Sequence, residues 1–113
     1  MDDKGNLDID NDLVLSTDRP RPHALTLYSP ISGIEMVAAT SYPVLHLYGS
    51  RHLNCNNGKR GEHYRSGKAL AIEPQFHTGA LNYANFPSIR FSPEKPYFQE
   101  IVYTFSTITK DDQ

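Results

Sequence analysis

The sequence predicts an all-β protein, organised as an antiparallel β-sandwich. Short runs of alternating apolar and polar residues recur along the chain, and clusters of Pro, Gly, Ser and Asn separate them. No window of about 11–18 residues has the 3.6-residue apolar period of an amphipathic helix, and the eight prolines interrupt every candidate. With 113 residues the chain fits one small domain, because typical domains run to about 100–150 residues.

The first half of the chain predicts a short strand and then a hairpin. Residues 1–12 are polar and acidic, and we expect them to be disordered because they can bury little apolar surface. A strand is expected over 13–15, and the prolines at 20 and 22 hold the next segment extended. Residues 24–28 alternate, which places Leu25 and Leu27 on one face, and residues 34–38 return after a turn.

The second half predicts further strands joined by longer loops. The strands are expected over residues 44–48, 68–75, 89–91 and 97–105. A polar loop over 49–67, a structured loop over 76–87 and a proline-containing turn over 93–96 connect them. The expected sandwich portion thus covers residues 13–108, and residues 109–113 form a polar tail.

Composition excludes several classes of function. The net charge is −2 and the pI is near 6.2. These values give no indication of the clustered basic face that nucleic-acid-binding proteins usually have. No stretch approaches the ~18 apolar residues of a membrane span. The acidic start of the sequence lacks the apolar core of a signal peptide. The single cysteine, Cys55, suits a reducing compartment, so a cytoplasmic location is expected. No group of His, Cys, Asp or Glu has metal-ligand spacing, so no metal site is expected.

The strand over 68–75 carries the best candidate for chemistry. Its alternation places Leu70 and Ile72 on one face and Glu73 and Gln75, with two small alanines, on the other. Partial burial of Glu73 would raise the proton affinity of its carboxylate towards the range useful for acid/base catalysis. The alternative is a solvent-facing strand whose Glu and Gln are simply hydrated.

A longer pattern surrounds this strand. Leu70 to Phe76 is followed by Asn82, by Asn85-Phe86-Pro87-Ser88 and by a Tyr-rich closing strand. The pattern resembles the C-terminal signature of the aldose 1-epimerases (galactose mutarotases). The resemblance implies a partial galactose mutarotase-like supersandwich, namely its C-terminal third.

The resemblance also implies roles for individual residues. Glu73 matches the general base that takes the proton from the anomeric hydroxyl of the sugar while a histidine protonates the ring oxygen. His46 stands where the family has a sugar-contacting Gln, and Gln75 and Asn82 complete the expected substrate-binding set. The family's Pro-Asp pair is replaced by Thr78-Gly79. The implied partner is an aldohexose, bound weakly or not at all by this chain alone, and mutarotation needs no cofactor.

The family's catalytic histidines and its Asp-His sugar-contact motif are expected to lie upstream of this sequence. We therefore expect a truncated aldose 1-epimerase-like protein of hexose metabolism that is inactive alone. The alternatives are a carbohydrate-binding or interaction module that keeps part of a sugar cleft, and a fragment without independent function. Self-association through exposed strand edges is expected in each case.

Overall fold

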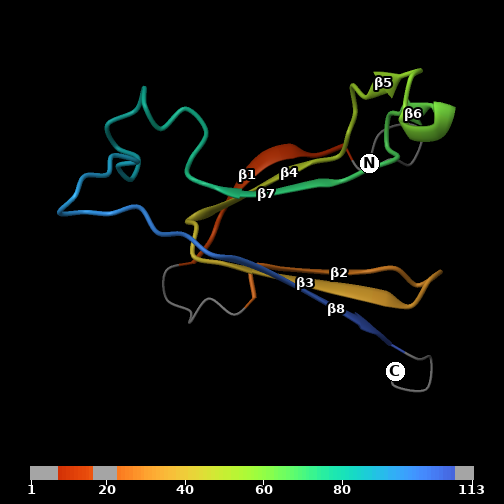
Figure 1. The fold of residues 1–113 in the computed structure, drawn as a ribbon, viewed down its shortest axis with the longest axis horizontal. Coiled ribbons are helices and arrows are strands. Elements are labelled where there is room, and N and C mark those ends of the chain that lie inside the picture. Colours follow the sequence, from red (N-terminus) through yellow and green to blue (C-terminus); the bar gives the residue numbers. More distant parts are fainter. Residues whose placement is uncertain (1–7, 17–22, 109–113) are drawn as a thin grey trace.

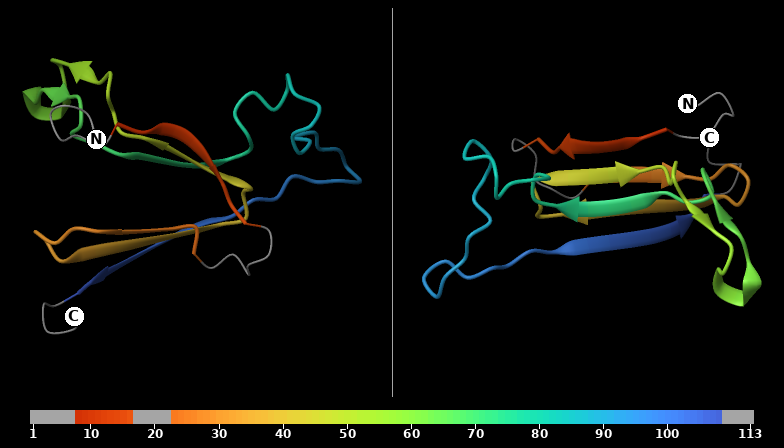
Figure 2. Two further views of the ribbon diagram at one scale, coloured as in Figure 1. Left: turned by 180° about the vertical axis from the view of Figure 1, so that it is seen from behind. Right: turned by 90° about the horizontal axis from the view of Figure 1, so that it is seen from above.

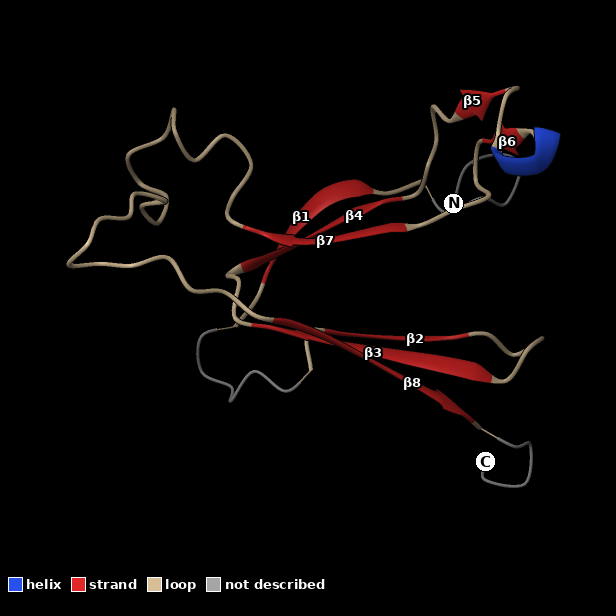
Figure 3. Ribbon diagram, in the orientation of Figure 1, coloured by secondary structure: helices blue, strands red, loops and turns tan. Residues whose placement is uncertain are grey.

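The computed structural model describes residues 8–16 and 23–108. The described residues form eight strands and one short 3₁₀ turn, Lys59–Gly61. The strands are β1 (Asp10–Val14), β2 (Leu25–Tyr28), β3 (Ile34–Thr40), β4 (Val44–Tyr48), β5 (Asn54–Cys55), β6 (Tyr64–Arg65), β7 (Ala71–Gln75) and β8 (Ile101–Thr107). Strands and loops make up nearly the whole ribbon (Figure 3).

Two three-stranded sheets lie in two layers (Figures 1 and 2). The first has the order β1-β4-β7 and the second the order β2-β3-β8, while β5 and β6 form a separate small hairpin. Every strand pair is antiparallel. The predicted all-β, antiparallel fold class is confirmed.

Several predicted boundaries differ from the structure. β1 begins at Asp10, inside the segment expected to be disordered, because Asp10 to Val14 pair with Tyr48 to Val44 of β4. Residues 89–91 are loop rather than strand, and β8 runs from Ile101 to Thr107. The long loop over 49–67 contains the β5-β6 hairpin. Predictions for residues 1–7, for the prolines at 20 and 22, and for 109–113 fall outside the described residues.

The chain crosses between the two sheets from β1 to β2, from β3 to β4 and from β7 to β8, and side-chain hydrogen bonds join the last two crossings. The Ser41 hydroxyl donates to Gln99 Oε1 (2.6 Å) and accepts from the Glu100 N–H (2.9 Å). The Thr40 hydroxyl donates to the Glu100 carbonyl (3.0 Å). The β3–β4 turn is thereby fixed to the end of the 76–100 loop, and this loop borders the site described below.

The buried apolar core of the described residues is small. It consists of Ala38 of β3 and of Val44, Leu45 and Leu47 of β4. β8 by contrast leaves large apolar side chains exposed, including Tyr103 (43 %) and Phe105 (66 %). The radius of gyration is 17.2 Å, against about 13 Å for a compact domain of 100 residues. The two sheets therefore bury little against each other.

Among the described residues, no helix has the length and apolar character needed to cross a membrane.

Candidate functional site

Three charged side chains lie in one row across the β1-β4-β7 sheet. In the register Asp12 pairs with His46, and His46 pairs with Glu73. Directly paired residues of neighbouring strands project to the same face, with their side chains within reach of one another. Three segments far apart in the sequence thus bring two carboxylates and an imidazole together.

This face forms one wall of a cavity of about 810 Å³, within the range of small-molecule sites, about 300–1,000 Å³. All four predicted site residues, His46, Glu73, Gln75 and Asn82, line it. The remaining lining comes from Asp10, from the loop over 76–82, and from Ile89, Phe91 and Tyr97. The structure thus brings the predicted residues to one place, and their chemical roles stay predictions.

Glu73 is exposed in the structure, which agrees with the solvent-facing alternative of the sequence analysis rather than with partial burial of its carboxylate. β7 is an edge strand of its sheet in the described residues, so only β4 pairs with it.

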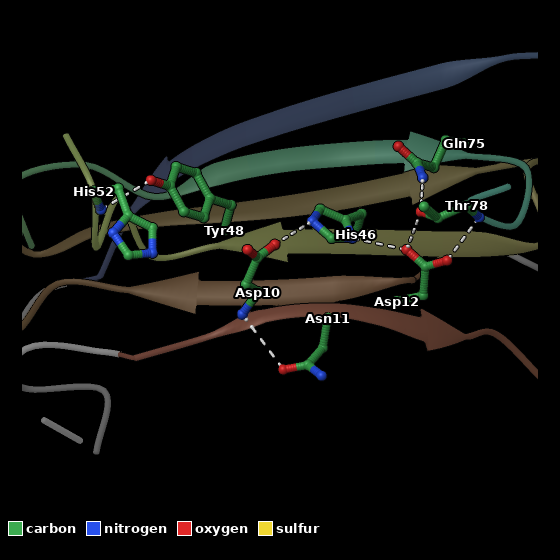
Figure 4. Close-up of polar contacts among 8 residues, drawn as sticks. All are labelled: Asp10, Asn11, Asp12, His46, Tyr48, His52, Gln75 and Thr78. Carbon is green, nitrogen blue, oxygen red and sulfur yellow. Dashed lines mark hydrogen bonds and ion pairs between the residues drawn. The ribbon is translucent and has the colours of Figure 1, made fainter.

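His46 is held between two carboxylates (Figure 4). Its Nδ1 lies 2.7 Å from Asp12 Oδ1 and its Nε2 lies 3.0 Å from Asp10 Oδ1. The imidazole is 18 % exposed. The hydrogen bond to Asp12 raises the pKa of His46 above 6.5; burial opposes this rise, and the Asp10 bond and the charges of Asp12 and Glu73 add to it. Both ring nitrogens are engaged, so His46 has no free N–H to offer a sugar in this geometry.

Asp12 connects His46 to the loop that follows β7. Its Oδ2 accepts from the Thr78 N–H (2.8 Å), and its Oδ1 accepts from the Thr78 hydroxyl (2.9 Å) as well as from His46. Gln75 Nε2 donates to the same hydroxyl oxygen of Thr78 (2.9 Å). Burial acts to raise the pKa of Asp12, but the bonds from Thr78 and His46 outweigh it and lower the pKa below 3.8. Asp12 is therefore charged at neutral pH.

The sequence analysis missed Asp10, Asp12 and Thr78. A signal was present, because Asp10 and Asp12 are two residues apart, which places two carboxylates on one face of a strand. The polar composition of residues 1–12 gave no strand pattern. β1 is a strand because it pairs with β4, and the buried apolar residues of this pair belong to β4.

His77 also lines the cavity, where its ring stacks on Phe86 with centroids 4.7 Å apart. Its Nδ1 is buried and has no hydrogen-bond partner among the described residues. Within the same residues, no three His, Cys, Asp or Glu side chains are placed to hold a metal ion.

Comparison with known proteins identifies the class of all-β protein to which this chain belongs. The family model described as aldose 1-epimerase matches residues 3–104. The chain therefore belongs to the aldose 1-epimerase family, as the sequence resemblance predicted.

A solved structure agrees with this assignment. The crystal structure of a GalM/aldose epimerase homologue from C. elegans is 51 % identical to this chain, with a TM-score of 0.78. The match covers 92 % of this chain and 31 % of the C. elegans chain, so the present sequence spans about a third of that protein's length. No curated protein matches.

Proposed function

We propose that this chain supplies the general-base side of an aldose 1-epimerase sugar site. Glu73 takes the proton from the anomeric hydroxyl, and an acid protonates the ring oxygen as the bond between that oxygen and the anomeric carbon breaks. Rotation of the resulting aldehyde and reclosure on its other face give the other anomer. The observation that supports this proposal is that Glu73 lines the same cavity as Gln75, Asn82 and His46.

We further propose that these 113 residues do not catalyse mutarotation alone. No residue of the sequence matches the family's catalytic histidine, and the nearest imidazole, His46, uses both nitrogens for Asp10 and Asp12. Loss of one acid/base group typically costs a factor of about 10²–10⁴ in rate. The proposal places the protein in hexose metabolism and in the cytoplasm, where its single cysteine stays reduced.

Polarimetry tests this proposal. Pure protein is added to fresh α-D-glucose or α-D-galactose, and the rate of equilibration is compared with that in buffer and with that of Glu73→Gln. We expect the three rates to agree. Catalysed equilibration that Glu73→Gln abolishes would contradict the inactivity while supporting Glu73 as the base.

A second candidate function is sugar binding without turnover. Phe91 and Tyr97 line the cavity and are 71 % and 53 % exposed, so two accessible aromatic rings share the cavity with Glu73. Aromatic rings can pack on the apolar face of a sugar while carboxylates accept hydrogen bonds from its hydroxyls, and ligand sites commonly combine these two kinds of group. Sugar-dependent NMR shifts confined to cavity residues would support this function, and unchanged spectra would count against it.

A further inference from the structure

The loop over 76–82 forms much of the cavity wall. Each of its seven residues lines the cavity, so the position of this loop sets the shape of the site beside Glu73. Its attachment to the β1-β4-β7 sheet is polar. Thr78 makes two hydrogen bonds to Asp12 and accepts a third from Gln75.

The geometry around His46 defines its protonation state. Asp10 and Asp12 face the two ring nitrogens at 3.0 and 2.7 Å. A carboxylate at neutral pH only accepts hydrogen bonds. Both ring nitrogens thus face acceptor oxygens, an arrangement that favours the imidazolium form of the ring with one carboxylate on each side.

The charges facing His46 come from both neighbouring strands and from the loop. β1 contributes Asp10 and Asp12, β7 contributes Glu73, and the 76–82 loop contributes His77 as a further titratable group lining the cavity. Tyr97 lines the same cavity. The cation of His46 is thus the centre of a row of carboxylates whose mutual repulsion it offsets.

We propose that Asp12 and protonated His46 are positioning residues that hold the 76–82 loop in place beside Glu73. His46 fixes the Asp12 carboxylate in the orientation that accepts from both the N–H and the hydroxyl of Thr78. We name these three residues, Asp12, His46 and Thr78, the loop clamp. The inference depends on the proposed function only in taking this cavity as the sugar site.

The clamp depends on the particular residues of this chain. The resemblance expects Gln at position 46 and Pro at position 78, and a proline has no N–H to donate. A neutral amide at position 46 could still bond Asp12, but it would not offset the charge of the two carboxylates. Thr78 and His46 therefore act together, although each departs from the family pattern.

Loss of a proton from His46 should release the clamp. One ring nitrogen then becomes an acceptor that faces a carboxylate oxygen, and the Asp10–Asp12 repulsion is no longer offset. The N–H and the hydroxyl of Thr78 can still donate, but the Asp12 carboxylate that accepts from them is then free to rotate. The loop should therefore loosen as pH rises through the titration of His46.

Hydrogen exchange of the 113-residue chain, without sugar, tests the clamp. The exchange rate of the Thr78 amide is measured by NMR between about pH 5 and 9 and divided by its intrinsic rate at each pH. We expect protection that falls about tenfold as His46 titrates, since charge-assisted hydrogen bonds are among the strong ones. The ¹⁵N shifts of the His46 ring report its protonation directly.

Three variants and two controls complete the experiment. His46→Gln should remove the pH dependence, Asp12→Asn should lower protection at every pH, and Thr78→Val should weaken the clamp while keeping the N–H. His63→Gln, at an exposed loop position directly before β6, should behave as the wild type. The amides of β3 serve as an internal control, because they lie in the other sheet.

A neutral His46 ring at about pH 6 would overturn the inference. So would a Thr78 amide with no protection at any pH, protection that does not change as His46 titrates, or an equal loss of protection in β3. Because no sugar is present, the result is independent of mutarotase activity. Conversely, if Glu73 were not the general base, the measured protection of the Thr78 amide would be unchanged.

Discussion

Replacing Leu45 with alanine should remove most of the chain's stability. Leu45 is 0 % exposed and is one of the two largest fully buried side chains among the described residues. It lies on the central strand β4, paired with Leu13 of β1 and Pro74 of β7. The variant therefore leaves a cavity at the centre of the first sheet.

The size of the effect follows from this burial. Truncation of a buried leucine to alanine costs about 2–5 kcal/mol, whereas whole domains are stable by about 5–15 kcal/mol. Because the described residues bury only four apolar side chains, we place this chain at or below the lower end of that range. At a urea slope of about 1–1.5 kcal/mol per M, a loss of about 3 kcal/mol lowers the midpoint by about 2–3 M.

Urea unfolding followed by circular dichroism measures this midpoint. Leu81→Ala is the matched control, because the same side chain is removed at a position that is 82 % exposed. We expect its free energy of unfolding to change by less than about 0.5 kcal/mol. If Leu45→Ala and Leu81→Ala had equal midpoints, the small core identified here would not be what stabilises the fold.

Further predictions concern association, pH and the hairpin turn. The exposed apolar face of β8 should cause concentration-dependent sedimentation and a broad melt, which Phe105→Glu reduces; a monomer with a sharp melt above ~55 °C would contradict this. The pKa of His46 is raised on folding, so the contribution of His46 to stability is complete below pH 6.5 and is lost as pH rises through the folded-state pKa. The urea midpoint of His46→Gln should not show this loss. A variant with the same pH profile as the wild type would refute the prediction. Gly33→Ala should cost about 1 kcal/mol more than Gly61→Ala, because both have positive φ but only a Cβ at Gly33 meets a backbone oxygen, at 3.0 Å; equal urea midpoints would refute this.

The sequence predicts the strands whose side chains alternate strongly. The ranges expected around β2, β3, β4 and β7 lie close to those observed, and the buried apolar side chains of the described residues all belong to β3 and β4. The positions of Glu73, His46, Gln75 and Asn82 around one cavity follow from the family pattern. The alternation of side chains along the strand predicts only that Glu73 and Gln75 share one face.

The two-residue spacing of Asp10 and Asp12 can be read from the sequence, but the partners of these two residues cannot. Asp10 and Asp12 belong to a strand that exists because β4 supplies backbone partners from residue 44 onward, and a local reading of residues 1–12 contains no such information. The role of Thr78 depends on a hydrogen bond across a sequence separation of 66 residues. Residues 89–91 have a strand-like composition but find no partner strand within the described residues.

The pairing of β3 with β8 has a consequence for folding rate. Thr40 and Glu100, which are hydrogen-bonded at the end of this pair, are 60 residues apart in sequence. Proteins dominated by such distant pairings fold slowly, in milliseconds to seconds, because a long loop must close before the contacts form. During synthesis β3 therefore leaves the ribosome well before its partner, with one edge bonded to β2 and the other open. That interval is when this chain is most vulnerable to aggregation, and when a chaperone would have most to protect.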